Sequence, residues 1–448
     1  MNDELYPKRN ILSIDLKSFF ASCECVARKL DPFTFPLVVA NPYQGGGAIT
    51  LAVTPYLKSL GVPSRGRIYQ IPKNIKYMIV PPRMSYYIKK SEEVISVYLD
   101  YVAKDDLYVY SIDECFLDVT NYLKMYKKTD YELAEEILDT IQKRTGLTAT
   151  CGIGPNILLA KVAMDTEAKK FKNGIAKWTY EDISNTLWQI TPLSKMWGIG
   201  PRMEKRLNAL GIYKVQDLAL YDKKKLKQKF GVMGEELWEH ANGIDLSVIS
   251  NIREPQIEKS YSNSQVLFKD YDGDNVKIII SEMVDVVTKR LRDNNKQTLL
   301  IGLAIGYSKN YGGGFYHVMK LDNPTDNTKD ILNSCLLLFD RYYENNAPIR
   351  RVGVSAGRLQ NKDYVQLDLF ESLEEKEKNR KEDKAIDEII AKYGKNSVLR
   401  ASALLEDSTI KDRNKKIGGH NAWVLIEVML NGHLLRPLYK EVQWLMMF

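Results

Sequence analysis

The sequence predicts a multidomain α+β protein. The chain has 448 residues, which corresponds to two to four domains at about 100–200 residues per domain. A β-α-β-β-α-β order of expected elements occurs within residues 11–170 and again within 259–360, whereas the pattern after about residue 180 is helical. Apolar residues make up 44% and charged residues 27% of the chain, which is ordinary for a globular protein and excludes disorder throughout.

The first of these orders is expected to form an antiparallel sheet with helices on a face. The apolar run at 11–15 predicts a buried strand that ends in a carboxylate, and the helical pattern after it stops at Asp31-Pro32. Further strands are expected at 107–112, 115–119 and 149–154, and helices at 84–104, 131–145 and 156–170.

Between residues 30 and 84 a smaller unit is expected. Two short strands, 37–40 and 48–53, precede a helix that ends at Gly61. Thr54 and Pro55 begin this helix, since Thr is a good N-cap and Pro is favoured at the first helical position.

The second half begins with helices and ends with another sheet. The polar, Pro-containing stretch 251–258 is typical of a linker. After it we expect strands at 260–268, 298–308, 315–321 and 349–357, with helices at 274–293 and 327–344. The highly charged helical stretch 372–393 is interpreted as a solvated tether.

Composition and charge limit the classes of protein to which this chain could belong. No apolar run reaches about 18 residues, so no transmembrane helix is expected, and the N-terminus has no signal-peptide pattern. Five scattered Cys indicate reduced thiols, and we expect a cytoplasmic protein. The net charge of +7 is mild, so a polyanionic partner has to be inferred from local clusters.

Histidine is absent before His240. Chemistry in the N-terminal half therefore uses neither a His base nor a His-ligated metal, and carboxylates with a hard metal ion remain. Three acids suit this: Asp15 at a strand end, and the adjacent Asp113 and Glu114. Neighbouring side chains on a strand face apart, so both can reach one site only at a turn. Carboxylates at a sheet edge are ligands for two Mg²⁺ ions, which activate a 3′-hydroxyl and stabilise leaving pyrophosphate. The alternative is that Asp15 caps a helix and the pair marks a surface turn.

With these motifs the chain resembles the Y-family (UmuC/DinB-type) translesion DNA polymerases. The resemblance covers about residues 10–360, and its motifs are Ile14-Asp15 with 19–24 (FFASCE), 110–114 (YSIDE), 152–163 with its Gly-Ile-Gly and Leu-Ala-Lys-Val-Ala, and Gly198-Ile199-Gly200. It implies a right-hand polymerase with a ferredoxin-like palm, small fingers, a helical thumb with a helix-hairpin-helix, and an α+β little finger. The expected bounds are palm 1–19 and 85–178, fingers 20–84, thumb 179–250, linker 251–258, little finger 259–360, and a C-terminal tether and tail at 361–448.

The resemblance also assigns catalytic residues. Asp15, Asp113 and Glu114 would ligate two Mg²⁺ ions, with the Leu16 carbonyl as a further ligand. Phe20 would stack under the deoxyribose and exclude a 2′-hydroxyl. The alternative places Phe20 in the core, a role that we expect of Phe19.

Basic residues are assigned to the triphosphate less directly. Lys58 would contact the triphosphate; the alternative is that Lys58 is only a solvent-exposed lysine on a helix. Many members have a phosphate-binding Tyr where this chain has Pro55, so Thr54, next to Pro55 and Tyr56, is our candidate. The spacing to Lys169 is one residue longer than in the family, so either Lys169 or Lys170 could serve. We expect Lys161 to pack within its own helix.

DNA contacts are expected in the second half. Gly198 and Gly200 lie between helical runs, and glycines let backbone N–H groups approach a phosphate. The lysine-rich stretch 223–229 supports this, although it could be only a solvated helix face. In the little finger, basic residues at strand ends would follow the DNA backbone: Lys259, Lys309, Arg350, Arg351 and Arg358.

The stretch 366–370 (QLDLF) resembles the peptide by which bacterial polymerases bind the β subunit of the sliding clamp. Gln366 would give polar fixation, and Leu367, Leu369 and Phe370 apolar anchors. The alternative is a short strand that finishes the little finger. Residues 395–420 resemble the C-terminal extension of bacterial UV-damage-repair members. The apolar tail 422–448 has no counterpart known to us.

The function expected is template-directed, low-fidelity DNA synthesis past damaged bases in an SOS-type response. Its partners would be primer–template DNA, dNTPs and the clamp, and the protein would act as a monomer. Small fingers cannot close tightly over a nascent pair, which weakens selection. The alternatives are a non-catalytic DNA-binding repair factor and a nucleotide cyclase. The three acids argue against the former, and the thumb, little finger and clamp peptide against the latter.

Overall fold

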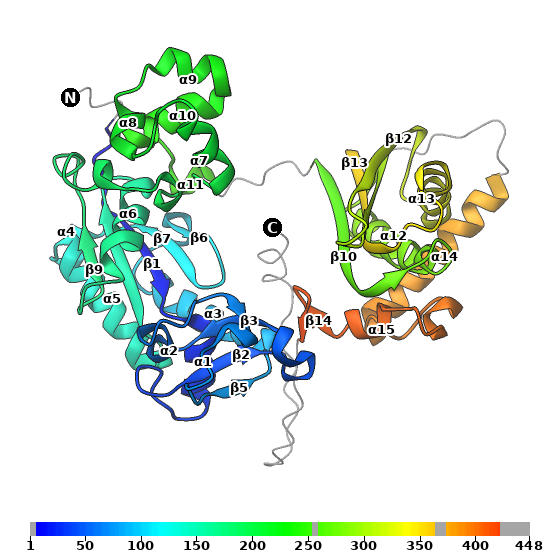
Figure 1. Cartoon of the computed structure of the whole chain (residues 1–448), viewed down its shortest axis with the longest axis horizontal. Coiled ribbons are helices and arrows are strands. Elements are labelled where there is room, and N and C mark those ends of the chain that lie inside the picture. The colour runs from blue at the N-terminus through cyan, green and yellow to red at the C-terminus, as the bar shows by residue number, and fades with distance from the viewer. Residues whose placement is uncertain (1–5, 253–258, 363–372, 422–448) are drawn as a thin grey trace. The chain divides into compact units, whose positions relative to one another are not determined.

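The computed structural model describes residues 6–252, 259–362 and 373–421 (Figure 1). Two compact units divide the chain: residues 1–254 with 417–448, and residues 255–416. None of the described helices is both long enough and apolar enough to cross a membrane.

The palm is a five-stranded sheet. Its strands lie in the order β6-β7-β1-β8-β9, and all neighbours are antiparallel except β8 and β9. The strands are β1 (Ile11–Leu16), β6 (Leu107–Val109), β7 (Glu114–Asp118), β8 (Ala149–Gly154) and β9 (Ile175–Lys177). The order of the first four confirms the ferredoxin-like expectation, while the parallel β9 was not predicted.

Helices cover both faces of this sheet, not one face as expected. The apolar side chains of β1 at Leu12 and Ile14 share a core with α3 (Met84–Leu99) and α5 (Asp130–Thr145). On the other face α6 (Ile157–Ala163) packs on β8. Gly152 permits this approach, since a Cβ there would lie 2.0 Å from the Ala160 carbonyl oxygen. The short α4 (Leu123–Tyr126) precedes α5.

The fingers are small. Strands β2 (Leu37–Ala40), β3 (Ile49–Val53), β4 (Gly66–Arg67) and β5 (Met78–Val80) form a sheet in the order β4-β3-β2-β5. Helix α2 (Pro55–Ser59) packs on it through Leu57, and α1 (Phe19–Ala27) joins the fingers to β1 of the palm. Among the described residues, the fingers have a small buried cluster of their own, which contains Val38, Ala40, Val53, Leu57, Val62 and Ile71.

The thumb is helical, as predicted. Its helices are α7 (Pro201–Asn208), α8 (Val215–Ala219), α9 (Lys223–Phe230), α10 (Val232–Ala241) and α11 (Ile249–Ile252). Leu207, Leu218, Leu226 and Leu237 contribute to one core with the end of α6. Helix α11 covers the first two residues of the stretch that we interpreted as a linker, and 253–258 lie outside the described residues.

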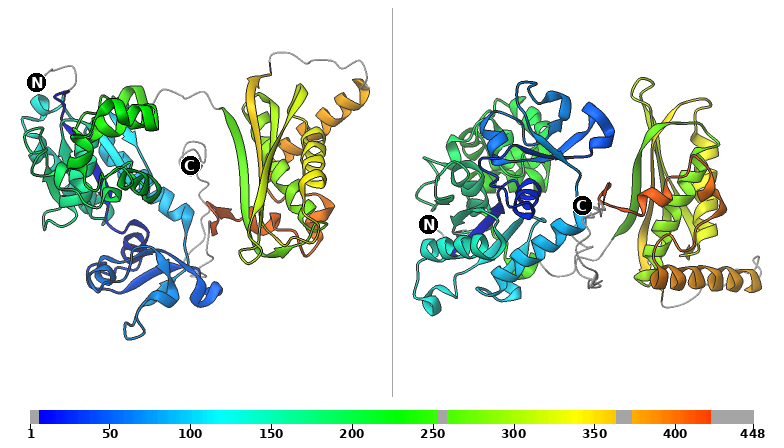
Figure 2. Two further views of the ribbon diagram at one scale, coloured as in Figure 1. Left: turned by 45° about the horizontal axis from the view of Figure 1, so that its top comes forward. Right: turned by 90° about the horizontal axis from the view of Figure 1, so that it is seen from below.

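The little finger is an antiparallel sheet in the order β10-β13-β11-β12. Its strands are β10 (Ser260–Tyr271), β11 (Lys296–Tyr307), β12 (Gly314–Thr325) and β13 (Ile349–Asn361). Helices α12 (Val276–Asp293) and α13 (Thr328–Tyr342) pack side by side against this sheet (Figure 2). The predicted element order is confirmed, and every strand is longer than expected.

The C-terminal segment packs on the little finger unit. In α14 (Leu373–Tyr393), Asp383 accepts hydrogen bonds from the Thr328 amide and hydroxyl at 3.1 and 2.8 Å, and Asp387 pairs with Arg292. The prediction of a solvated tether is therefore wrong for this part of α14, because these acids stabilise the start of α13 and the end of α12.

Residues beyond α14 pack on α12 as well. Arg400 forms a two-point ion pair with Asp285 at 2.7 and 2.8 Å. The buried Glu282 accepts hydrogen bonds from Ser408 and Thr409, just before α15 (Ile410–Arg413). The short strands β14 (Lys416–Ile417) and β15 (His420–Asn421) pair with each other.

Candidate active site

The three acids lie near one another where β1 ends and β7 begins. Asp15 lies directly opposite Glu114 in the pairing of these strands. The amides of Tyr110 and Ser111 both donate to the Glu114 carbonyl at 3.0 Å, which closes the predicted turn. The Leu16 amide donates to the Asp113 carbonyl at 2.9 Å, so this turn is attached to the end of β1. The turn thus brings both adjacent acids toward Asp15.

Two lysines from the α6 side pair with these acids. Lys161 Nζ lies 2.7 Å from Glu114 Oε1, and Lys169 Nζ lies 2.7 Å from Asp15 Oδ2. Both lysines also pair with Asp165. We expected Lys161 to pack within its own helix; it does pair with Asp165 there, but its ammonium group also reaches Glu114 of β7. No local sequence pattern indicated this second contact, because Glu114 lies far from Lys161 along the chain.

Burial has the largest effect on the pKa values of Asp15 and Glu114. It raises the pKa of Asp15; the charge of Lys169 opposes this shift and that of Asp113 adds to it. Burial also raises the pKa of Glu114 to about 7, against the opposing effect of Lys161. Side-chain exposure is only 10% at Glu114 and 19% at Asp15. These carboxyl groups therefore ionise fully only where positive charge compensates their desolvation.

This pKa shift predicts a pH-dependent stability. Between the ordinary pKa of 4.5 and the folded value of about 7, folded Glu114 keeps a proton that the unfolded chain has lost. Its stabilising contribution is thus present below pH 4.5 and lost as the pH rises through about 7. In EDTA, urea unfolding at pH 5 and pH 8 should show a loss in the free energy of unfolding that Glu114→Gln reduces by roughly 1–3 kcal/mol. Equal losses in both proteins would contradict this.

The donor set suits a hard divalent cation, although it is not arranged as a cage. Among the residues that the structure describes, no three His, Cys, Asp or Glu side chains are grouped closely enough to hold a metal ion. Lys161 and Lys169 supply the positive charge beside the acids instead. The buried Oε1 of Glu114 makes its ion pair without a well-aligned hydrogen bond, so this oxygen retains capacity as a ligand. Metal ligation by the three acids stays a prediction.

Phe19 has the core place that we expected, whereas the role of Phe20 under the deoxyribose stays a prediction. Phe19 is buried in the palm core, whereas Phe20 is half-buried. The Phe20 ring stacks on Tyr87 of α3 with ring centroids 4.5 Å apart. The Tyr87 hydroxyl donates to the fully buried Glu24 at 2.7 Å, and Arg83 pairs with the same carboxylate. Sequence reasoning missed this support for Phe20, because Tyr87 lies far along the chain from it.

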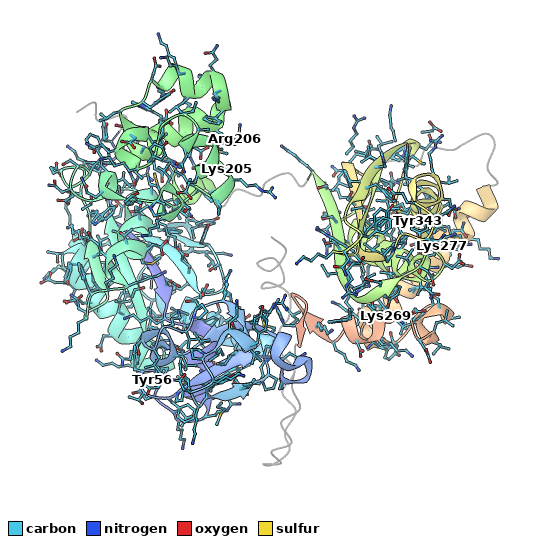
Figure 3. All side chains as sticks on the ribbon, in the orientation of Figure 1. Tyr56, Lys205, Arg206, Lys269, Lys277 and Tyr343 are labelled. Carbon is cyan, nitrogen blue, oxygen red and sulfur yellow. The ribbon has the colours of Figure 1, made fainter. Side chains whose placement is uncertain are left out.

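The fingers place one basic residue near the acids. Burial lowers the pKa of Lys58, and the charges of Asp15 and Asp113 oppose this shift, so Lys58 lies within their field. Thr54 is fully buried, and its hydroxyl accepts a hydrogen bond from the Leu37 amide at 3.2 Å. The prediction that Thr54 contacts the triphosphate is therefore wrong. Tyr56 on α2 is half-buried (Figure 3).

Of Lys169 and Lys170, one reaches the acids. Lys169 contacts Asp15, whereas Lys170 is exposed and forms no ion pair within the described part of the chain. The lysine that reaches the acids is therefore Lys169, and its contact with a triphosphate stays a prediction.

The thumb glycines are open to an approaching ligand. Gly198 has φ +89°, Gly200 precedes α7, and a Cβ at either would meet no atom within 4 Å. Lys205 and Arg206 project from this helix (Figure 3) and were not singled out from the sequence.

The lysine-rich stretch of α9 is partly neutralised. Lys223 pairs with Glu239 at 2.8 Å and Lys227 pairs with Glu235 at 2.7 Å. These two lysines thus belong to a solvated, internally paired helix face, which was the alternative interpretation.

Of the little-finger candidates, Lys259 and Arg351 are exposed, and Arg350 pairs with Asp270 at 3.0 Å. The clamp-peptide candidates Gln366, Leu367, Leu369 and Phe370 lie outside the described residues.

Models of the impB/mucB/samB family match residues 14–165 and, for its C-terminal domain, 258–369; a model of the family's HHH motif matches 180–212. The putative UV-damage repair protein UvrX of Bacillus subtilis (strain 168) is 40% identical over 421 residues, which cover 93% of this chain and 99% of UvrX. The chain belongs to the Y family of DNA polymerases. The resemblance inferred from the sequence is thus confirmed.

Other Y-family relatives agree. DNA polymerase IV 2 of the same Bacillus strain is 32% identical over 414 residues, covering 92% of this chain and 98% of the relative. A Y-family DNA polymerase chimera of known structure matches 78% of this chain and 98% of its own with a TM-score of 0.62 at 22% identity. This likeness confirms the predicted fold class.

Proposed function

We propose that this Y-family polymerase performs template-directed, low-fidelity DNA synthesis past damaged bases, using two Mg²⁺ ions held by Asp15, Asp113 and Glu114. The observation that carries the proposal is the convergence of these acids at the β1 end and the β6–β7 turn. The non-catalytic alternative has no observation in its favour, because the acids and the lysines around them are all present.

The bound Mg²⁺ ions would lower the pKa of the primer 3′-hydroxyl and stabilise the leaving pyrophosphate. The chain's own residues bind and orient the nucleotide. Lys58 and Lys169, which lie near the acids, would bind the triphosphate through their ammonium groups. Phe20, whose ring stacks on Tyr87, would lie under the deoxyribose and contact it.

The fingers support low fidelity. Their own buried cluster is small and comes from a four-stranded sheet, the short helix α2 and the segments beside them. Such a small element makes few contacts with a nascent base pair, so a wrong pair loses little binding energy relative to a correct one.

A primer-extension assay with Mg²⁺ and dNTPs tests the proposal. We expect extension on an undamaged template and across a template lesion, with both lost on chelation by EDTA. A non-catalytic repair factor would bind primer–template DNA without extending it. A nucleotide cyclase would convert nucleotide without any template.

Recruitment by the sliding clamp is part of the proposal and rests on residues 366–370. Leu369 and Phe370 are large apolar residues beside a highly charged stretch. Such anchors typically cost about 2 kcal/mol or more when truncated, or roughly 30-fold in affinity. We expect Leu369→Ala/Phe370→Ala to weaken clamp binding and processive synthesis by this factor and to spare single-nucleotide insertion. Clamp affinity and distributive insertion are measured on one preparation. An equal fall in both would show that this stretch belongs to the folded little finger.

A further inference from the structure

The helix that carries Lys161 contains a π-helical turn. Helix α6 continues into this turn at Met164–Ala168, and the Lys169 amide donates to the Met164 carbonyl, five residues back, at 3.3 Å. An α-helix rotates about 100° per residue, so residues seven apart lie on nearly one face and residues eight apart diverge by about 80°. A π turn takes up one extra residue. Lys161 and Lys169, eight apart, thereby return to the same face.

Asp165 lies between the two lysines on that face. Its Oδ2 is 2.9 Å from Lys161 Nζ, and its Oδ1 is 2.7 Å from Lys169 Nζ. Each lysine reaches one acid of the candidate site with the same ammonium group, Lys161 to Glu114 and Lys169 to Asp15, both at 2.7 Å. The five charges therefore form a continuous chain in which Asp165 is the central member.

The two lysines depend on Asp165 to different degrees. The side chain of Lys161 is only 8% exposed, so surrounding atoms restrict it as well. The Lys169 side chain is 42% exposed and is long and flexible. Apart from Asp15, its only ion-pair partner among the described residues is Asp165. Loss of Asp165 would leave Lys169 attached to the site by a single contact.

We infer that Asp165 is a positioning residue: through the π turn it holds Lys169 against Asp15 and orients its ammonium group toward the incoming triphosphate. The π turn keeps Lys161, Asp165 and Lys169 on one face, so that Asp165 contacts both lysines. This inference rests on the proposed function, in which Lys169 binds the triphosphate.

The test measures equilibrium binding of the correct dNTP to the protein on a primer–template whose primer ends in a dideoxynucleotide, so that no chemistry follows. Asp165→Asn keeps the side-chain shape and removes the charge. We expect its dNTP Kd to rise about tenfold, as for Lys169→Ala, because each loses a charge-assisted contact. The double variant should bind no more weakly than Lys169→Ala, since both changes disable one group.

Two further variants separate positioning from general damage. Glu167→Gln, in the same turn but without an ion pair in the described structure, should bind dNTP as the wild type does. Deleting Glu167 places the lysines seven residues apart without a π turn and should leave the Kd within about twofold. If Asp165→Asn does not fold by thermal unfolding, Asp165→Glu, which keeps the charge but displaces both oxygens, should raise the Kd a few-fold.

The outcomes are distinct. Wild-type affinity in Asp165→Asn together with a weakened Lys169→Ala would overturn the inference and leave the proposed function standing. Additive effects in the double variant, or a deletion variant as weak as Lys169→Ala, would also overturn it. Failure of the wild type to extend an unblocked primer would reject the proposed function itself.

Discussion

Asp113→Ala and Glu114→Ala should each abolish primer extension, with a loss of roughly 10³-fold or more in the rate of insertion. Glu114 is buried and lies opposite Asp15 in the pairing of β1 and β7, and Asp113 precedes it in the turn that is attached to the end of β1. Removing either acid would take away a proposed metal ligand, and removing Glu114 would also take away the carboxylate that pairs with Lys161. Primer–template affinity should stay within a few-fold, because the expected DNA contacts belong to the thumb and little finger. Single-turnover insertion and DNA binding, measured on the same preparations, check both halves of this expectation.

Asp118→Asn is the matched control. Asp118 lies on the same strand as Glu114, pairs with Ile11 at the other end of β1, and accepts a hydrogen bond from the Thr120 amide at 3.1 Å. It should insert nucleotides at the wild-type rate. Substantial turnover in Asp113→Ala would remove Asp113 from the catalytic site and leave the turn with a purely structural role.

Phe20→Ala should raise ribonucleotide incorporation relative to deoxynucleotide incorporation by roughly 100-fold, equivalent to about 3 kcal/mol of lost discrimination. The physical reason is steric. The ring is held by its stack on Tyr87, and Tyr87 is fixed by the buried Glu24, so a 2′-hydroxyl that overlaps the ring cannot displace it easily. The measurement is kcat/KM for matched rNTP and dNTP insertion opposite the same template base.

Phe19→Leu provides the contrast for Phe20. Phe19 is buried in the palm core, so shortening it should lower the free energy of unfolding and leave the rNTP/dNTP ratio unchanged. An unchanged ratio in Phe20→Ala would return Phe20 to the core as well, which was the alternative from the sequence.

Several features could be predicted from local sequence, because they depend on patterns that short segments carry. Alternating and continuous apolar runs predicted the strands of the little finger and four of the five palm strands, all except β9. The adjacency of Asp113 and Glu114 required a turn, and the turn is present at residues 110–114. The absence of His before His240 directed attention to carboxylates. These inferences need only chain connectivity and the geometry of a strand.

Other features were decided by tertiary structure alone. Thr54 is an N-cap by its type, yet its hydroxyl binds the Leu37 amide and its side chain is fully buried. Burial of this kind depends on which strand pairs alongside, which no local pattern encodes. Helix α14 has the charged composition of a tether. Its acids nevertheless form an ion pair with Arg292 and a hydrogen bond with Thr328, which lie more than fifty residues earlier in the chain.

The candidate site shows the same division. Its acids were recognisable because each stands beside a strand with a clear apolar pattern. The ion pair of Lys161 with Glu114 was missed, because it depends on the packing of α6 on the palm sheet. Lys169 was a candidate from the sequence, and a π turn keeps it on the face that meets Asp15. One extra residue in an α-helix rotates every later side chain to another face, unless a π turn accommodates that residue. The sequence by itself determined the order of the strands and helices and which acids adjoin strands β1 and β7, because these depend on local patterns. The packing of α6 on β8 and β1 decided which basic groups those acids meet.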